Sequence, residues 1–459
     1  MSDIGRIAVL DIGKTNAKVV LLDCASGAEI AERRTANRVL AGPPYPHYDI
    51  EALWAFTLRA LSELAAEGFD ALSITTHGAS AVLLDAKGEL ALPALDYEHA
   101  YPQHVQDAYR TIRPPFSETF SPPLPGGLNL GAQLHYQKTA FPEEFARVRT
   151  IMTYPQYWAW RLTGVAANEV TSLGCHTDLW KPRDGSYSTL VDSLGIRHLM
   201  APLRSAFDAL GPVLPDIADT IGLQQGVPVY CGIHDSNASL LAHLVGRPPP
   251  FSVVSTGTWV VNFAVGGDLD HLDATRDTLA NVDAYGRAVP SSRFMGGREF
   301  ERLAAELGPF SAEAALATLP DVLAQNLMLL PNLAEGSGPF PGAKSAWLHA
   351  DDATLPQRWA AACLYLALMT DTCLGLIGAK GPTLVEGPFA GNPVYLRALR
   401  SLLGRPVIAL PGSTGTSQGA ALLAIPHALP QKGTEVETLP QDISAYRQAW
   451  HAAIRQTRP

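Results

Sequence analysis

Short apolar runs on either side of a polar segment open the chain. Residues 7–10 (IAVL) and 19–22 (VVLL) consist of β-branched and aliphatic side chains, a pattern that predicts buried strands. The segment between them, residues 11–18 (DIGKTNAK), contains the Gly-Lys-Thr that ends a Walker A phosphate loop. That loop requires a further glycine where this chain has Ala8, and a helix where it has the second apolar run. The pattern therefore predicts a β-hairpin, either a plain polar turn or one that binds phosphate. The residues at its tip are Asp11, Gly13, Lys14, Thr15 and Asn16.

The same pattern returns near the middle of the chain. Residues 246–250 (GRPPP) place three prolines in a row, which neither a helix interior nor a central strand tolerates, so they mark a domain boundary. Residues 251–265 (FSVVSTGTWVVNFAV) then repeat an apolar run, a tip with Gly and Thr, and a second apolar run. We therefore expect two domains with related cores, residues 1–246 and 247–459.

Helix-like and strand-like segments alternate in the first third of the chain. Residues 49–66 carry apolar side chains at helical spacing after an acidic cap, and residues 69–75 and 81–85 have the pattern of buried strands. Helical patterns dominate residues 132–162, whereas the proline-rich residues 114–125 predict a surface loop. This alternation is typical of an α/β fold.

Composition narrows the class of protein. The 459 residues are too many for one ordinary core, and 47% hydrophobic with 17% charged residues is typical of a well-packed soluble protein. A net charge of −10 argues against a surface that binds nucleic acid or anionic lipid. Residues 361–379 approach the length of a membrane span, but their polar centre predicts a buried helix. Five scattered cysteines and the lack of a secretory pattern predict a cytoplasmic protein with reduced thiols.

Four segments, in order along the chain, resemble the FGGY carbohydrate kinases of the actin-like ATPase clan. They are residues 11–18, 232–239 (GIHDSNAS), 255–259 (STGTW) and 386–399 (EGPFAGNPVYLRAL). The resemblance covers nearly the whole chain and implies two actin-like (ribonuclease H-like) α/β domains flanking a cleft for ATP and sugar. Two hairpin tips suit the phosphates of one nucleotide, because glycine lets backbone N–H groups approach the oxygens.

The resemblance also implies a nucleotide and metal site. Asp11 and Asp235 would hold magnesium, although an Asp in the position of Asp11 is equally typical of a side chain that stabilises a turn. The implied nucleotide and phosphate contacts are Gly13, Lys14, Thr15, Asn16, Thr256, Gly257, Thr258, Gly297, Gly387, Ala390 and Asn392.

A phosphoryl transfer needs a group that receives the proton of the acceptor hydroxyl. Residues 232–239 resemble the strand-to-helix motif that carries the catalytic base of the family, which is Asp235 here. Without the resemblance, the N-cap of a helix that starts at Ser236 is the simpler interpretation of Asp235.

The sugar side of the family is also represented. Residues 73–90 match the length and spacing of a segment in L-fuculose and L-rhamnulose kinases, and His77 is similar to the sugar-contacting His of xylulose kinases. A lone buried His is more often a satisfied core residue than a ligand contact. The implied substrate contacts are His77, Gly78, Asp96, Tyr97, His234 and Asp235.

Three positions depart from the family. Lys14 stands where relatives have threonine or a small residue, so it either adds a cation to the phosphate site or points to solvent. Ser80 replaces an Asp of the deoxyketose kinases, and Pro388 with Phe389 replaces two glycines of the adenosine segment.

The sequence thus predicts an ATP- and magnesium-dependent kinase that phosphorylates a terminal hydroxyl of a small ketose, such as L-fuculose or L-rhamnulose. A kinase of a pentulose or polyol (xylulose, ribulose, glycerol-like) is the alternative, followed by an actin-like ATPase without a sugar acceptor. We expect the sugar and ATP as partners, with no nucleic acid and no membrane, and the sequence leaves a homodimer open.

Overall fold

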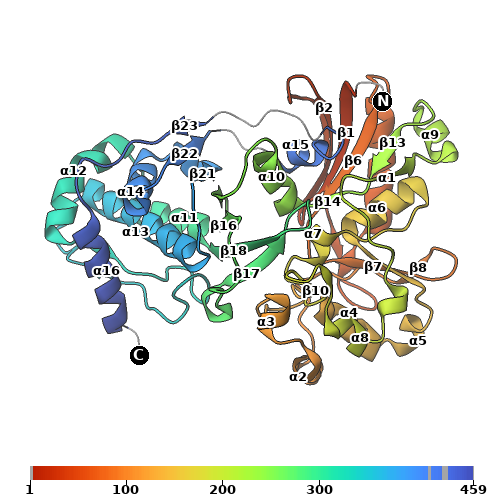
Figure 1. The fold of residues 1–459 in the computed structure, drawn as a ribbon, viewed down its shortest axis with the longest axis horizontal. Coiled ribbons are helices and arrows are strands. Elements are labelled where there is room, and N and C mark those ends of the chain that lie inside the picture. The colour runs from red at the N-terminus through yellow and green to blue at the C-terminus, as the bar shows by residue number, and fades with distance from the viewer. Residues whose placement is uncertain (1–3, 412–414, 426–432, 458–459) are drawn as a thin grey trace. The chain divides into compact units, whose positions relative to one another are not determined.

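The chain forms two compact units (Figure 1). The computed structural model describes residues 4–411, 415–425 and 433–457. Unit 1 comprises Met1–Arg247, Ala280–Ala288 and Thr414–Pro430, and unit 2 comprises Pro248–Leu279, Val289–Ser413 and Gln431–Pro459. The chain first passes into unit 2 inside the proline-rich segment. The two later segments of unit 1 have no counterpart in the sequence-based expectation.

Unit 1 is built on a twisted, mostly buried sheet in the order β12-β13-β6-β1-β2-β3, with β14 also pairing with β6. Its strands are β1 (Arg6–Ile12), β2 (Asn16–Asp23), β3 (Glu29–Ala36), β6 (Ala71–Thr76), β12 (Ala209–Pro212), β13 (Pro228–Tyr230) and β14 (Ile233–His234). The first predicted hairpin is confirmed, because β1 pairs antiparallel with β2 up to Ile12 and Ala17. Strands β6 and β14 run parallel to β1, so the carboxyl ends of all three lie at one edge of the sheet.

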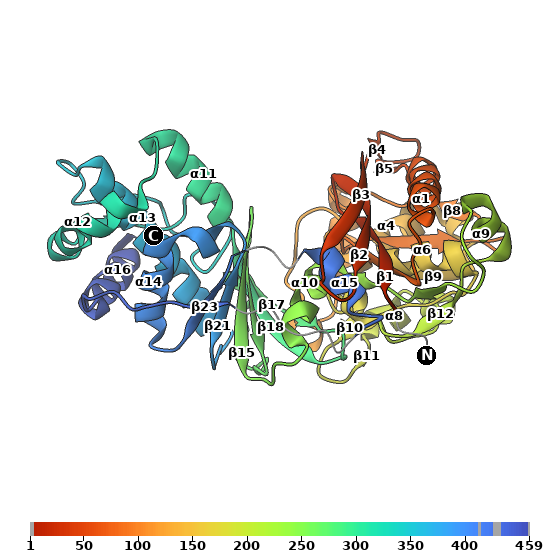
Figure 2. The ribbon, with the colours of Figure 1, turned by 90° about the horizontal axis from the view of Figure 1, so that it is seen from above.

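Helices cover both faces of this sheet, as Figure 2 shows. One face packs on α1 (Ile50–Ala65), α6 (Tyr154–Thr163) and α9 (Pro215–Ile221), and the other on α10 (Asp235–Leu244) and α15 (Thr416–Ala421). Successive side chains of β1 point to opposite faces. Leu10 and Ile12 therefore join the core under α1, while the intervening Asp11 faces α15. The predicted helix after Asp49 is confirmed, and the Asp49 carboxylate accepts a hydrogen bond from the amide of Ala52 at 3.1 Å.

A smaller, separate core fills the rest of unit 1. The elements around it are the sheet β8-β7-β9 (Leu90–Leu92, Ala81–Leu84, Thr150–Thr153), the short pair β10–β11 (Trp180–Lys181, Ser186–Tyr187), and the helices α2 (Gln103–Ile112), α3 (Phe116–Thr119), α4 (Leu130–Ala140), α5 (Pro142–Phe145), α7 (Val170–Leu173) and α8 (Thr189–Ser193). A further short pair, β4–β5 (Val39–Leu40, His47–Tyr48), contributes Tyr48 to the core of the large sheet.

One expectation is wrong in this part of unit 1, and one strand was not foreseen. Residues 114–125 are not simply a surface loop: they contain α3, and Phe120 and Ser121 are buried because Arg113 binds the Ser121 carbonyl and the buried Asp178 carboxylate. Helices α4, α5 and α6 do dominate residues 132–162 as expected, but the short strand β9 between them, which pairs with β7, was not foreseen.

Unit 2 repeats the central arrangement of unit 1. Its sheet has the order β17-β18-β16-β15-β21-β22-β23, in which β15 and β16 form the second predicted hairpin and β21 runs parallel to β15. The strands are β15 (Phe251–Thr256), β16 (Val260–Val265), β17 (Thr278–Val282), β18 (Ala288–Phe294), β21 (Thr383–Glu386), β22 (Val407–Leu410) and β23 (Thr434–Glu435), with a separate pair β19–β20 (Met328–Leu329, Trp347–Leu348). In both units, the hairpin is followed by a strand that pairs parallel with its first strand.

Helices of unit 2 enclose its largest apolar cluster. They are α11 (Gly296–Leu307), α12 (Ala312–Gln325), α13 (Leu355–Leu376), α14 (Pro393–Leu403) and α16 (Ser444–Thr457). Helix α13 packs on β16 and against both α12 and α14. It is long and apolar enough to cross a membrane, but 83% of its most apolar 18-residue stretch is buried inside the fold, as expected of a core helix.

Helix α15 docks on α10 through a glycine, which generates a prediction. A Cβ atom at Gly419 would lie 1.8 Å from the Ala238 carbonyl oxygen, whereas one at Gly375 of α13 meets no atom within 4 Å. We expect Gly419→Ala to lower the free energy of unfolding of the chain by about 1–3 kcal/mol, the usual cost of overpacking. The matched Gly375→Ala should leave it unchanged or raise it by up to about 1 kcal/mol, because alanine favours helix. Urea denaturation of both variants measures the difference, and equal effects would contradict the docking.

Candidate functional site

The carboxyl ends of β1, β6 and β14 bring three predicted site residues together. Asp11 lies near the end of β1, His77 directly follows β6, and Asp235 directly follows β14. In the parallel register Asp11 pairs with Thr75, and His234 pairs with Thr76. Asp11 and His77 are 66 positions apart, and His77 and Asp235 are 158 positions apart, yet all three meet at one edge of the sheet.

Asp11 is held by hydroxyl groups from the far end of the chain. The hydroxyls of Thr416 and Ser417, at the start of α15, donate to its Oδ2, with 3.0 Å for Ser417, and the Lys18 amine lies 3.8 Å from the same oxygen. Burial raises the pKa of Asp11, the Thr416 hydroxyl and Lys18 lower it, and the negative charge of Asp235 raises it further. Asp11 is therefore not the side chain that stabilises its own turn.

Asp235 is the first residue of α10, and the N-cap position belongs to His234. Its Oδ1 accepts hydrogen bonds from the Ser236 amide at 2.6 Å and the Ser236 hydroxyl at 3.3 Å, and His234 Nε2 lies 3.1 Å away. These contacts do not use Oδ2, and 28% of the side chain is exposed. Burial raises the pKa of this carboxyl above its ordinary value. Asp235 thus presents a partly open carboxylate with enhanced basicity.

His234 orients Asp235 as a neutral donor. Burial lowers its pKa to about 4, and the side-chain amide nitrogen of Asn237 lies 3.1 Å from its Nδ1. Because that amide nitrogen only donates, Nδ1 is the acceptor and the ring proton sits on Nε2, facing Asp235. A Cβ atom at Gly78 would lie 2.7 Å from this Nε2, so only glycine leaves room for the ring.

His77 lies in an aromatic cluster with one ring nitrogen unsatisfied. Its ring centroid is 4.9 Å from that of Tyr48, 5.0 Å from Tyr154 and 5.5 Å from Tyr97. Nδ1 lies 2.9 Å from the Gly78 carbonyl oxygen, so it carries the proton, and Nε2 is a buried acceptor without a partner among the described residues. Burial lowers the pKa of His77 to about 4. His77 is therefore not a fully satisfied core histidine.

Lys14 turns toward the predicted substrate residues. Its amine forms an ion pair with Asp96, lies 3.6 Å from Glu98 and 3.5 Å from the Tyr48 hydroxyl, and sits 4.7 Å from the centre of the Tyr97 ring. Its side chain is only 19% exposed, so it does not point freely into solvent. The sequence predicts a phosphate contact for Lys14, whereas the structure gives its amine these partners.

The remaining tip residues of the first hairpin are more open. Gly13 donates its amide to the Asn16 carbonyl at 2.8 Å, which closes the turn, and the Asn37 side chain holds the Gly13 carbonyl at 2.8 Å. Thr15 and Asn16 are exposed. The Asn16 side-chain amide donates a hydrogen bond to the Thr15 hydroxyl at 3.0 Å, and both side chains are open to solvent.

The sequence reasoning missed four residues that support this edge of unit 1. Thr416 and Ser417 hold Asp11, and the buried Glu169 binds the amide and hydroxyl of Thr171 at 3.0 and 2.5 Å. The Thr171 hydroxyl in turn accepts a hydrogen bond from the His234 amide at 3.1 Å, and burial raises the pKa of Glu169 to about 7. A Thr-Ser pair that opens a helix and a Glu that caps one were the available signals.

In unit 2, the tip of the second hairpin is exposed and supported by α11. Gly257 and Thr258 are exposed, and the Gly257 amide donates to the Trp259 carbonyl at 2.9 Å. A Cβ atom at Gly297 would lie 1.9 Å from the Gly257 carbonyl oxygen. Gly297 therefore serves close packing of α11 on the tip.

Other predicted nucleotide residues of unit 2 have structural partners. The Thr256 hydroxyl donates to the Glu386 carbonyl at 2.5 Å and accepts from the Phe389 amide at 3.0 Å, and Gly387, at φ 78°, would place a Cβ atom 1.9 Å from the Thr256 carbonyl. The Asn392 side-chain oxygen caps α14 through the amides of residues 394 and 395, both at 3.1 Å. Ala390 is buried, as is Phe389, whose ring packs against Phe300 and Tyr395.

Two carboxylates of unit 1 suit a magnesium ion. Among residues 4–411, 415–425 and 433–457, no group of three or more His, Cys, Asp or Glu side chains is arranged to hold a metal. Magnesium needs only one or two carboxylates when a substrate supplies phosphate oxygens. Asp11 and Asp235 fit that requirement. Each carboxyl has a raised pKa, and the negative charge of Asp235 contributes to the raised pKa of Asp11. A dication between them would relieve this repulsion.

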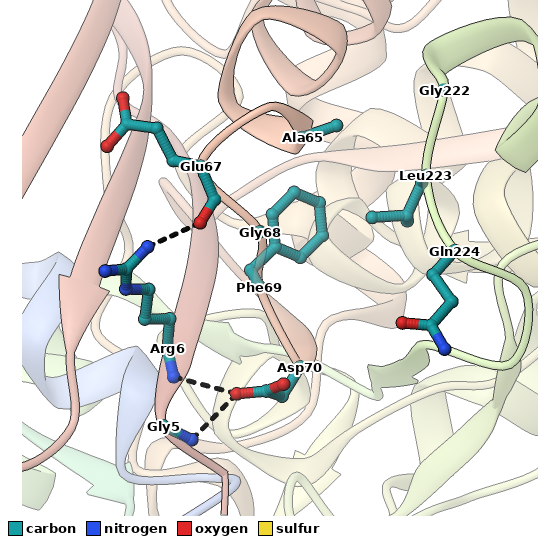
Figure 3. Close-up of a pocket in the computed structure, with 10 residues that line it drawn as sticks. All are labelled: Gly5, Arg6, Ala65, Glu67, Gly68, Phe69, Asp70, Gly222, Leu223 and Gln224. Atoms are coloured by element: carbon teal, nitrogen blue, oxygen red, sulfur yellow. Dashed lines mark hydrogen bonds between the residues drawn. The ribbon is translucent and has the colours of Figure 1, made fainter.

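A separate pocket of unit 1 lies at the other end of the same strands (Figure 3). It is lined by residues 5–6 before and at the start of β1, residue 65 at the end of α1, residues 67–70 before β6, and residues 222–224 after α9. Its polar groups bind each other: Asp70 accepts from the amides of Gly5 and Arg6 at 2.8 and 3.0 Å, and the Arg6 guanidinium binds the Glu67 carbonyl (Figure 3). This pocket belongs to the amino ends of β1 and β6, away from Asp11, His77 and Asp235.

The burial of His77 yields a prediction about its protonation. With a pKa of about 4, the ring stays neutral from pH 8 down to about pH 5. We expect the Cε1–H signal of His77, identified by its loss in His77→Gln, to keep its chemical shift over that range in a proton NMR titration. A signal that titrates near the ordinary value of about 6.5 would show that the ring is solvated instead.

Comparisons with known proteins give the family. The chain matches the N-terminal domain of the FGGY family of carbohydrate kinases over residues 6–242 and the carbohydrate kinase FGGY C-terminal domain over residues 248–433. The crystal structure of a carbohydrate kinase from Novosphingobium aromaticivorans is 40% identical, covers 99% of both chains and superposes with a TM-score of 0.93, which confirms the predicted α/β two-domain kinase fold.

Curated relatives match more weakly. An L-fuculokinase of Salmonella typhi is 26% identical over 58% of this chain, and an L-xylulose/3-keto-L-gulonate kinase of Escherichia coli (strain K12) is 29% identical over 35%. The chain spans 57% of the length of the first and 32% of the second. Because the two domain models match in order and together cover most of the sequence, the chain belongs to the FGGY family of carbohydrate kinases.

Proposed function

We propose that the chain transfers the γ-phosphoryl group of ATP to a terminal hydroxyl of a small ketose, such as L-fuculose or L-rhamnulose. The observation that carries this proposal is the Asp235 carboxylate. It stands at the carboxyl ends of parallel strands, its Oδ1 is fixed by Ser236 and His234, and its Oδ2 takes part in none of those bonds. Membership of the carbohydrate kinase family supports a hydroxyl as the group that this oxygen meets.

Asp235 acts as the proton acceptor. In a phosphoryl transfer the acceptor oxygen forms a bond to phosphorus, the bond to the leaving ADP oxygen breaks, and the hydroxyl proton must leave. Asp235 Oδ2 receives that proton, and its raised pKa makes it a better base than an exposed carboxylate. The neutral His234 donor holds the carboxylate in orientation without adding a full charge.

The ketose is oriented by side chains of unit 1. His77 Nε2 accepts a hydrogen bond from a sugar hydroxyl, because its other nitrogen carries the proton. Asp96 supplies a second acceptor, and the Tyr97 ring a flat apolar surface. Sugar binding through several directed hydrogen bonds and a ring face is the usual pattern of a polar ligand site.

The two units divide the work in this proposal. Residues 1–246 would bind the sugar and residues 247–459 the nucleotide, with Thr15, Asn16, Gly257 and Thr258 at the exposed tips as phosphate contacts. Magnesium held by Asp11 and Asp235 would neutralise charge on the transferring phosphoryl group. Thr256, Gly297, Gly387 and Asn392 contribute by shaping this region, since each has a close packing or hydrogen-bonding role within unit 2.

A pentulose or polyol is the second candidate substrate. The relative from Escherichia coli is named for L-xylulose and 3-keto-L-gulonate, so acceptors other than deoxyketoses occur among similar proteins. An actin-like ATPase without a sugar acceptor fits less well, because it gives no role to the unpartnered His77 Nε2. We also propose a cytoplasmic location, which is supported by the free thiols of Cys24, Cys231, Cys363 and Cys373.

The role of Asp235 is tested by removing its basicity while keeping its shape. We expect Asp235→Asn to lower kcat for ketose phosphorylation by about 10²- to 10⁴-fold, because general base catalysis contributes that much. ATP binding, measured by calorimetry, should change little. The control is Asp184→Asn, which removes an exposed carboxylate paired with Lys181. A coupled assay of ADP release across neutral ketoses and polyols measures both, and near-normal turnover of folded Asp235→Asn would refute the proposal.

A further inference from the structure

The residue that departs most clearly from the family pattern, Lys14, is bound into the wall of the proposed sugar site. Its amine is paired with Asp96 and lies against two aromatic rings, 4.7 Å from the centre of Tyr97 and 5.1 Å from that of Tyr48. The Tyr97 ring in turn contacts His77, whose Nε2 is the buried unpartnered acceptor. The Lys14 amine is thus held by the Asp96 carboxylate and the rings of Tyr48 and Tyr97, and it does not extend from the hairpin tip into solvent.

The Lys14–Asp96 pair keeps hydrogen-bonding capacity on both sides. Asp96 accepts from Lys14, from the Tyr48 hydroxyl at 3.3 Å and from the Glu98 amide at 3.2 Å, and all three bonds end on Oδ1. None of them uses Oδ2. The Lys14 ammonium has three N–H groups, of which the Asp96 bond takes one, and its contacts to Tyr48 and Glu98 are long, at 3.5 and 3.6 Å. The pair therefore offers an acceptor and a donor side by side, which matches two neighbouring hydroxyl groups.

The charge around this pair disfavours an anion. The Lys14 ammonium lies next to the carboxylates of Asp96 and Glu98. Burial raises the pKa of Tyr97, and the negative charges of Glu98, Asp235 and Asp96 raise it further, so Asp235 lies in the same neighbourhood. The negative charge of Asp235 also raises the pKa of His77, whereas the positive charge of Lys14 lowers it. The single ammonium of Lys14 faces two carboxylates, Asp96 and Glu98, so this group carries a net negative charge, and a sugar acid would bring a further negative charge to it.

We propose that Lys14, through its ion pair with Asp96, is a specificity-determining residue that selects neutral ketoses with neighbouring hydroxyls over sugar acids. Lys14 then acts on the sugar and not on the phosphates of ATP. This inference rests on the proposed function and names the substrate class of the same site. It separates the chain from a relative that is named for both L-xylulose and an acid, 3-keto-L-gulonate.

The first test removes the amine. We expect Lys14→Met to raise KM for L-fuculose about 10- to 100-fold, the loss of one charge-assisted hydrogen bond, with KM for ATP unchanged. Lys14→Arg should recover part of the loss, since it keeps the charge in another geometry. The matched control is Lys87→Met, an exposed lysine of unit 1. If Lys14→Met raises KM for ATP while KM for the ketose stays the same, Lys14 is a phosphate contact and the proposal falls.

The second test changes the charge. The wild type should turn over L-fuculose or L-xylulose with a kcat/KM at least 10-fold above that for 3-keto-L-gulonate, and Asp96→Asn should reduce this preference at least 10-fold by freeing the ammonium. A wild type that prefers the acid, or an Asp96→Asn variant with unchanged preference, would overturn the inference. Should Lys14→Met fail to fold, Lys14→Met/Asp96→Asn leaves no unpaired buried charge and is expected to show the same rise in ketose KM.

Calorimetry without ATP separates this inference from the proposed function. If Lys14→Met binds L-fuculose more weakly than the wild type in this experiment, and the wild type does not phosphorylate any ketose in the coupled assay with ATP, the sugar role of Lys14 is supported and the kinase reaction is refuted. Equal ketose binding by both proteins would refute the role of Lys14, even if the wild type phosphorylates the sugar.

Discussion

The parallel pairing of β1, β6 and β14 is the constraint on which the site of unit 1 depends. Each strand ends at the same edge of the sheet, so each delivers the residue that follows it to the same place. These pairings bring Asp11, His77 and Asp235 together, although the three residues lie far apart in the sequence. A one-residue slip of β14 against β6 would turn Asp235 away from this edge, because side chains alternate between the faces of a sheet.

Burial at this edge sets the chemistry of the groups that the strands deliver. It lowers the pKa of His77 and His234 to about 4, so both rings are neutral at pH 7, and each presents one defined donor and one defined acceptor. It raises the pKa of Asp11 and Asp235, which makes the first a fitting ligand for a dication and the second a stronger base. The hydroxyls of Thr416, Ser417 and Ser236 limit the cost of burying these carboxylates.

Much of this arrangement was predictable from local pattern. Apolar runs around the two polar tips gave both hairpins, and the acidic residue before residues 50–65 gave α1 with its cap. The partners of Asp11 were not predictable, because 405 positions separate it from Thr416 and a single sequence carries no record of such pairs. The direction of Lys14 was also hidden, since its long flexible stem allows its amine to reach either the tip or Asp96. For Thr256 and Asn392 a motif identified the positions, but only the structure shows that their side chains are used to hold β21, the segment after it and α14.

In the reaction that we propose, the Asp235 carboxylate meets the reacting hydroxyl of a ketose whose other hydroxyls are held by unit 1. A crystal structure of the chain with L-fuculose bound tests it most directly. We expect the terminal hydroxyl within about 2.6–3.2 Å of Asp235 Oδ2, with further hydroxyls on His77 Nε2 and on the Lys14–Asp96 pair. A ketose bound away from Asp235, or one whose hydroxyls leave His77 Nε2 without a partner, would contradict it.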